Sequence, residues 1–231
     1  MKVIGLIGGM SWESTVEYYR LINEAVKHRL GGLHSAKCVL YSVDFAEVEE
    51  LQRQGNWSEA AELLTAAALN LEQGGADFVV ICTNTMHKVA DAIQARIGIP
   101  LLHIADATAD AVKRAGLHRV GLLGTRFTME DDFYRGRLTQ QFGLEVVIPD
   151  DEDRKTVHRV IYAELCVGKI RPESKAHLAA IISRLVGMGA QGIILGCTEL
   201  GLLLDARDSR VPLFDTTQVH ALAAVEEAMK L

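Results

Sequence analysis

The stretch Phe78-Val-Val-Ile-Cys-Thr-Asn-Thr-Met86 joins a short apolar run to a polar tail, and a similar stretch recurs later in the chain. The first copy follows Gly75-Ala76. The second follows Gly189-Ala190 and reads Gly-Ile-Ile-Leu-Gly-Cys-Thr-Glu. Aligning the two Gly-Ala pairs places Thr83 opposite Cys197, at an offset of 114 residues.

A second pair of similar segments lies upstream of these two. Ile4-Gly-Leu-Ile-Gly8 is matched by Val120-Gly-Leu-Leu-Gly124, with an offset of 116 residues. Two motifs that repeat in the same order at nearly the same offset indicate a duplicated α/β unit.

Apolar runs typical of buried strands alternate with amphipathic stretches typical of helices along the whole chain. This alternation predicts parallel sheets flanked by helices, that is, two pseudo-symmetric, doubly wound α/β domains. We divide the chain near Pro100, into a first domain of residues 1–99 plus 211–231 and a second of residues 100–210. Strands are expected at 2–7, 38–43, 78–82, 119–124, 145–148, 192–195 and 211–214, and a new element is expected to start at 101–104. Helices are expected at 12–30, 44–54, 58–73, 86–96, 106–115, 130–142, 156–167, 173–188 and 216–230, with a surface loop at 149–153.

Bulk properties exclude several classes of function. The 231 residues carry a net charge of −6 without a Lys/Arg cluster, which argues against a nucleic-acid partner. No apolar run approaches the roughly 20 residues needed to cross a membrane, and the N-terminus lacks the pattern of a signal peptide. The four cysteines form no CxxC pair, which argues against a disulfide framework or a zinc site. A cytoplasmic location is expected.

Polar side chains cluster where predicted strands end. In open parallel sheets ligands bind beyond the carboxyl ends of the strands. Loops 8–11, 83–85 and 197–199 have this position, and loop 124–128 duplicates the first of them. If the two halves face each other, Thr83 and Cys197 lie opposed across one cleft. Backbone N–H groups at the starts of the following helices are expected to hold carboxylates and to lower the pKa of a nearby thiol.

Other candidate residues have simpler interpretations. Cys82 precedes Thr83 in a strand, so it should point to the opposite face and lie in the core. Cys38 and Cys166 are also expected to be structural. His87, one turn into its helix, fits either a surface histidine or a residue that supports the site without touching substrate, and the surface interpretation is favoured. The glycine loop at 5–9 lacks G-x-G-x-x-G spacing, and no His/carboxylate spacing demands a metal ion.

Taken together, Gly8-Gly9-Met10, Thr83-Asn84-Thr85, the segment 196–199 and the duplication resemble the aspartate/glutamate racemase family. The resemblance covers essentially the whole chain and is strongest to broad-specificity amino-acid racemases. It implies two similar α/β domains with the active site between them, a small amino-acid substrate and a homodimer. It also implies catalysis without pyridoxal phosphate, metal or other cofactor.

The family mechanism, as the resemblance implies it, uses two cysteines on opposite faces of the substrate Cα. Cys197 matches the second cysteine and is assigned to the L-enantiomer. Thr83 replaces the first, which the family carries in a Cys-Asn-Thr motif. A threonine hydroxyl does not ionise near neutral pH without a strong neighbouring base, although it can donate or relay a proton.

The resemblance also suggests how the substrate is held. Its α-carboxylate is expected to bind backbone N–H groups and side chains of Met10, Asn84, Thr85, Thr198 and Glu199. Aspartate-specific relatives carry a lysine where this chain has Cys166, and an arginine near Gln52 and Arg53. Gln52 is therefore a candidate for side-chain recognition. Without a charged partner for a second carboxylate, specificity should extend to neutral substrates such as homoserine.

Two alternatives stay open at this point. A single catalytic cysteine also fits an arylmalonate-decarboxylase-like decarboxylase or an isomerase of dicarboxylates. A chain that lost one of two catalytic thiols also fits a non-catalytic amino-acid-binding protein.

Overall fold

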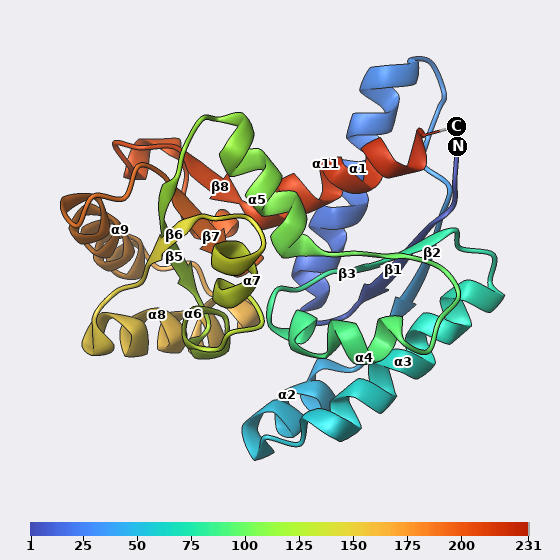
Figure 1. The fold of residues 1–231 in the computed structure, drawn as a ribbon, viewed down its shortest axis with the longest axis horizontal. Coiled ribbons are helices and arrows are strands. Elements are labelled where there is room, and N and C mark those ends of the chain that lie inside the picture. Colours follow the sequence, from blue (N-terminus) through green and yellow to red (C-terminus); the bar gives the residue numbers. More distant parts are fainter. Residues whose placement is uncertain (231) are drawn as a thin grey trace. The chain divides into compact units, whose positions relative to one another are not determined.

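The computed structural model describes residues 1–230, which form two compact units (Figure 1). The first unit contains Met1–Ile104 and the segment from His220 onward, and the second contains Ala105–Val219. The sequence-based division placed residues 211–219 in the first domain. They lie with the second unit because the strand β8 (Leu213–Asp215) pairs with β7 (Ile193–Gly196).

Each unit is built on a four-stranded parallel sheet. The first sheet has the order β2-β1-β3-β4 and the second β6-β5-β7-β8, so the two halves share one topology. The predicted fold class, a duplicated parallel α/β architecture, is confirmed. The remaining strands are β1 (Ile4–Gly8), β2 (Cys38–Ser42), β3 (Phe78–Ile81), β4 (Leu101–Leu102), β5 (Arg119–Gly124) and β6 (Glu145–Val147).

The registers of the two sheets correspond residue by residue. Gly5 of β1 pairs with Val79 of β3, and Gly121 of β5 pairs with Ile193 of β7. Thr83 lies four residues beyond Val79, and Cys197 lies four residues beyond Ile193. Thr83 and Cys197 therefore occupy equivalent positions at the carboxyl ends of equivalent strands.

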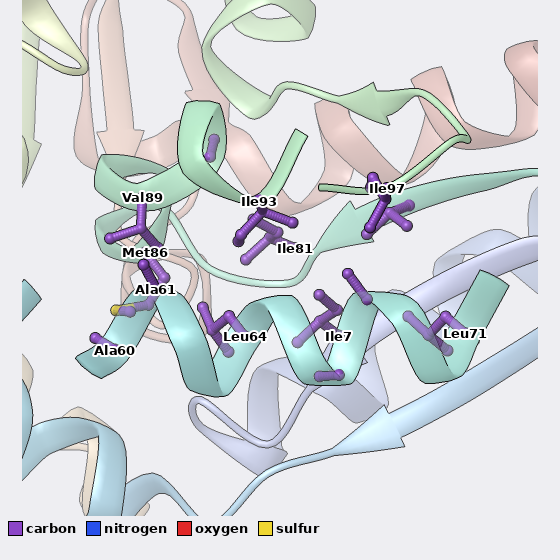
Figure 2. Packing of buried hydrophobic residues seen from close by; sticks show 14 of the residues in the cluster. Ile7, Ala60, Ala61, Leu64, Leu71, Ile81, Met86, Val89, Ile93 and Ile97 are labelled. Atoms are coloured by element: carbon purple, nitrogen blue, oxygen red, sulfur yellow. The ribbon is translucent and has the colours of Figure 1, made fainter. Parts of the chain in front are cut away.

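Helices cover both faces of the first sheet, with one apolar cluster on each face (Figure 1). Alternate residues of β3 divide between the clusters: Val79 and Ile81 pack in one, and Phe78 and Val80 in the other. Figure 2 shows Leu64 and Leu71 of one helix directed toward Ile7 and Ile81. The helices of this unit are α1 (Trp12–Leu30), α2 (Phe45–Gln54), α3 (Trp57–Gln73), the 3-10 helix η1 (Thr85–Val89), α4 (Ala90–Gln94) and the part of α11 (Thr216–Ala228) from His220 onward.

Glycines let one helix approach each sheet closely. A Cβ at Gly5 would lie 2.9 Å from the Ala76 Cβ and 3.3 Å from the Leu71 Cβ. A Cβ at Gly121 would lie 3.3 Å from the Leu185 Cβ. The repeated glycine thus packs against the last turns of α3 and of α9 (Pro172–Gly187), which are equivalent helices.

The helices of the second unit differ in part from those expected. The expected helix at 130–142 is wrong: the chain forms α6 (Arg126–Glu130) and α7 (Arg135–Gln140) instead. Thr125 starts α6 early by accepting a hydrogen bond from the Thr128 N–H at 3.3 Å, and α6 ends at Asp131, whose backbone is extended. The remaining helical elements are α5 (Ile104–Arg114), α8 (Asp151–Ala163), η2 (Leu165–Val167), α10 (Leu200–Leu203) and η3 (Ala206–Asp208).

The expected loop at 149–153 is also wrong, because α8 begins at Asp151. The Asp150 carboxylate accepts a hydrogen bond of 2.9 Å from the Asp153 N–H and caps the helix. Three acidic residues in the first turn complement the helix dipole. None of the helices within residues 1–230 has the length and apolar character to cross a membrane.

Candidate active site

Thr83 follows β3 and is partly exposed, whereas Asn84 and Thr85 after it are buried. The Thr83 N–H donates to the Ile81 carbonyl at 2.9 Å. The Thr83 carbonyl accepts a hydrogen bond of 2.8 Å from His87 Nδ1. Both backbone polar groups of Thr83 are thus held by neighbours in its own unit, which fixes the backbone at this position.

His87 is buried, with only 2% of its surface exposed, so its interpretation as a surface histidine is wrong. Its Nε2 accepts a hydrogen bond of 3.2 Å from the Ile104 N–H, which assigns the proton to Nδ1 and makes Nδ1 the donor to Thr83. The spacing of four residues between Thr83 and His87 was the sequence signal for this contact.

Two further buried histidines lie beside His87. Its ring centroid is 4.5 Å from that of His103 and 5.8 Å from that of His220. His220 Nδ1 lies 2.8 Å from the Tyr18 hydroxyl, and its Nε2 lies 2.9 Å from the Leu102 carbonyl. Since the carbonyl only accepts, His220 donates from Nε2 and accepts from Tyr18. The sequence analysis did not identify this cluster, because its members are far apart in the chain.

Cys197 follows β7 and lies beside a buried carboxylate. Its Sγ donates to Glu199 Oε2 at 2.8 Å, and Thr198 Oγ1 donates to the same oxygen at 3.0 Å. The exposed fractions of Cys197 and Glu199 are 6% and 2%. Thr217 Oγ1 donates to the Thr198 carbonyl at 3.3 Å. A buried thiol and a buried carboxylate are therefore held together at the end of β7.

The pKa of the Cys197 thiol is raised well above its ordinary value. Burial is the largest cause, and the nearby Glu199 carboxylate adds to it, since both disfavour a thiolate. The expectation that helix N-terminal N–H groups lower this pKa is wrong, because desolvation and the adjacent negative charge dominate. In this structure Cys197 is a thiol that donates a hydrogen bond to Glu199.

The other cysteines are placed differently. Cys82 is buried in the apolar cluster with Ile4 and Phe78, as expected, and burial raises its pKa. Cys38 is half-buried in β2. Cys166, expected to be structural, is half-buried in η2, and η2 packs against α10, the helix that begins directly after Glu199.

Met10 and Gln52, two expected substrate-binding residues, are buried in the first unit. Met10 packs in the apolar cluster that also contains Val48 and Met86, which leaves its backbone as the part suited to bind substrate. The Gln52 side-chain amide donates to Met86 Sδ at 3.0 Å. Gln52 therefore contacts the residue directly after Thr85.

The turns after α2 and η2 are equivalent by the duplication. Gly55 donates to the Gln52 carbonyl at 3.2 Å, and Gly168 donates to the Leu165 carbonyl at 3.0 Å. Both glycines have a left-handed backbone conformation, with φ of 71° and 69°. Arg53 and Cys166 each lie two residues before the glycine and therefore correspond to each other. Both positions were considered in the sequence analysis for a charged side chain that would pair with a second carboxylate of the substrate.

Within residues 1–230, no three or more His, Cys, Asp or Glu side chains gather in a way that could hold a metal ion. The end of β3 carries a threonine hydroxyl, and the end of β7 carries a thiol–carboxylate pair. This is a set of side chains for acid–base chemistry on a duplicated α/β scaffold.

Comparisons with known proteins agree with this description. The chain matches the Asp/Glu/hydantoin racemase family over residues 7–224. A solved structure of a candidate Asp/Glu racemase from Yersinia pestis is 59% identical, with a TM-score of 0.93 and 100% of both chains covered. An aspartate racemase homologue from Pyrococcus horikoshii OT3 is 35% identical, with a TM-score of 0.86 and again 100% of both chains covered.

A curated relative shows more distant similarity. The broad-specificity amino-acid racemase RacX of Bacillus subtilis is 25% identical over 229 residues, which is 96% of each chain. The match of the family to nearly the whole length decides the assignment: the chain belongs to the Asp/Glu/hydantoin racemase family.

Proposed function

We propose that the protein racemises amino acids without pyridoxal phosphate or metal, with Cys197 and Thr83 acting on opposite faces of the substrate Cα. The chain is an amino-acid racemase by its family and its racemase relatives; the proposal concerns mechanism and substrate range. The observation that carries it is the equivalence of Thr83 and Cys197 in the two sheet registers. A duplicated scaffold with one proton-transferring group per copy suits a reaction that needs one such group on each face.

In the L-to-D direction, the Cys197 thiolate removes the α-proton and becomes a thiol. The electron pair left on Cα delocalises into the α-carboxylate. The Thr83 hydroxyl then delivers a proton to the other face and regains one from water. In the reverse direction hydroxide takes up the Thr83 hydroxyl proton and re-forms water, the Thr83 oxygen accepts the α-proton, and the Cys197 thiol donates its proton to the other face.

Glu199 supports this chemistry as the acceptor of the Cys197 proton. The raised pKa of Cys197 means that the thiol form dominates before reaction. Transfer of the proton across the 2.8 Å bond to Glu199 Oε2 generates the thiolate that the L-substrate requires. The same carboxylate returns or releases the proton afterwards.

Substrate anchoring is proposed for the amide and hydroxyls of Asn84, Thr85 and Thr198, with the backbone of Met10. Gln52 recognises the distal side-chain group as a neutral hydrogen-bonding residue. With Cys166 at the position of the family lysine, we propose a substrate range that includes neutral amino acids such as homoserine beside aspartate and glutamate.

Measurement of α-proton exchange in D2O across L- and D-amino acids tests this function. We expect exchange and inversion in the wild type, and a loss of several orders of magnitude in Cys197→Ser, since a serine hydroxyl does not ionise near neutral pH. Cys38→Ser is the control and should keep wild-type activity. Near-normal turnover by Cys197→Ser would overturn the assignment.

The same assay separates the two alternatives. Release of CO2 from a malonate-type substrate without exchange of amino-acid α-protons would indicate an arylmalonate-decarboxylase-like activity. Saturable binding of amino acids without any exchange would indicate a binding protein. The family resemblance further supports a homodimer, which light scattering on the purified protein can test. It also supports a cytoplasmic location.

A further inference from the structure

We propose that His87 is the positioning residue for Thr83, and therefore controls the half of the reaction that Thr83 performs. This inference rests on the proposed function. His87 lies one helical turn after Thr83, in η1, and joins the Thr83 carbonyl to the Ile104 N–H.

The two hydrogen bonds of His87 fix its ring in one orientation. Nδ1 lies 2.8 Å from the Thr83 oxygen, and Nε2 lies 3.2 Å from the Ile104 nitrogen. A 180° flip of the ring would put Cδ2 and Cε1 in the places of Nδ1 and Nε2 and lose both hydrogen bonds, and the other tautomer would set an N–H against the Ile104 N–H. One tautomer in one orientation therefore satisfies both partners. Packing against the His103 ring, with centroids 4.5 Å apart, further restricts rotation.

As a result, both the N–H and the C=O of Thr83 are held by hydrogen bonds. Its N–H is bound to the Ile81 carbonyl at 2.9 Å and its C=O to His87. The position of the Thr83 Oγ1 then depends on one side-chain torsion. A hydroxyl is a poor proton donor to carbon and depends strongly on placement, since a misplacement of about 1 Å can cost about 100-fold in rate.

Cys197 is held by different contacts. Its partner Glu199, and Thr198, which donates to the same Glu199 oxygen, belong to the second unit, whereas His87 belongs to the first. Loss of the His87 bond to Thr83 should therefore impair proton delivery by Thr83 and spare proton removal from L-substrates by Cys197. Loss of overall structure would instead impair both.

Each of two substitutions at His87 is expected to keep one of the two hydrogen bonds and lose the other. In His87→Asn the side-chain amide takes the place of Nδ1 and can donate to the Thr83 carbonyl. In His87→Gln the side-chain oxygen takes the place of Nε2 and can accept from the Ile104 N–H, but the bond to Thr83 is lost. The measured quantity is the ratio of inversion to α-proton exchange for an L-substrate in D2O.

We expect this ratio to fall by 10-fold or more in His87→Gln, with L-exchange within about threefold of wild type, and to stay within about threefold in His87→Asn. Because it is a ratio, it does not depend on the fraction of folded enzyme. An unchanged ratio in His87→Gln, or an equal fall in both variants, would overturn the role of His87 while leaving the racemase proposal intact. Absence of exchange and inversion in the wild type would overturn both.

Discussion

The Cys197 thiol donates a hydrogen bond of 2.8 Å to the Glu199 carboxylate, and both side chains are buried. This pairing keeps the thiol protonated before reaction, since burial and the carboxylate both raise its pKa. It also places a proton acceptor in direct contact with the sulfur. The pair can therefore act as an acid without rearrangement, and as a base after one proton transfer.

Glu199→Gln should shift the titration of Cys197. Burial, the largest cause of the raised pKa, remains, but the negative charge is removed, so the midpoint for alkylation of Cys197 should move to lower pH. Racemisation should nevertheless slow by 10-fold or more, because the thiol loses its proton acceptor. Iodoacetamide labelling of the Cys197 peptide, followed by mass spectrometry, measures the midpoint.

Thr198→Val is the matched control for this experiment. It removes the 3.0 Å bond from Thr198 to the same carboxylate oxygen but leaves the charge in place. Its alkylation midpoint should stay close to that of the wild type. A midpoint in Glu199→Gln equal to or above the wild-type value would show that Glu199 does not control the thiol.

Because buried thiols stay protonated in the folded state, the protein should lose stability at alkaline pH. Burial raises the pKa of Cys82, and an unfolded cysteine ionises at about pH 8.5. The folded state therefore holds a proton that the unfolded state releases. The associated stability is fully present below about pH 8.5 and declines above it by up to about 1.4 kcal/mol per pH unit for each such thiol.

Cys82→Ala isolates this effect. Urea unfolding of the wild type should show a steeper fall in the free energy of unfolding between about pH 8.5 and 10 than unfolding of the variant. The variant loses some packing at every pH, so the slope and not the absolute value is the relevant quantity. Equal slopes would mean that folding does not raise the pKa of Cys82.

The sequence alone predicted the duplication and, through it, the positions of the two strand-end motifs. The offset of 114 residues between Thr83 and Cys197 reappears as equal distances from Val79 and Ile193 in the two registers. This succeeded because buried parallel strands and their glycines leave a strong local pattern. The start of α8 was missed because its acidic first turn resembles a solvated loop in composition.

The environment of the site was harder to predict than its position. The direction of the Cys197 pKa shift depends on how deeply the thiol and Glu199 are buried together, which the order of residues does not reveal. The histidine cluster brings together residues from η1, from the segment before α5 and from α11. Such contacts depend on the packing of helices on one face of the sheet.

Replacing Gly5 of β1 by alanine should lower the free energy of unfolding. In Gly5→Ala the new Cβ would lie 2.9 Å from the Ala76 Cβ and 3.0 Å from the Phe78 carbonyl oxygen, both rigid atoms. We expect a loss of about 1–3 kcal/mol in the free energy of unfolding. Gly187→Ala is the control: it lies exposed in α9 with no atom within 4 Å of a new Cβ, and should stabilise by about 0.5–1 kcal/mol. Urea denaturation checks both, and equal effects would contradict the packing argument.

Cys166→Lys should change substrate preference. Cys166 lies in η2, which packs against the helix that follows the Cys197 motif, and it corresponds to Arg53 in the other copy of the repeat. An ammonium group there would pair with a second carboxylate on the substrate, so kcat/KM for aspartate relative to homoserine should rise about 10-fold. Cys166→Met, similar in length but neutral, is the control. Strict aspartate specificity of the wild type would contradict the premise.

Thr83→Cys should make the two halves of the reaction more alike. In the wild type, complete racemisation must have equal kcat/KM in both directions, because the enantiomers have equal free energy. The difference between thiol and hydroxyl can appear only in partial reactions. We expect L-substrates to exchange their α-proton with D2O faster than they invert, since the carbanion often regains a proton from Cys197 before Thr83 delivers one. A thiol at position 83 ionises far more readily than a hydroxyl, so inversion of L-substrates should approach exchange and D-substrates should exchange faster. Thr83→Ser retains a hydroxyl and should keep the wild-type ratio. Equal exchange rates for the two enantiomers in the wild type would show instead that Thr83 is already activated as strongly as a thiol.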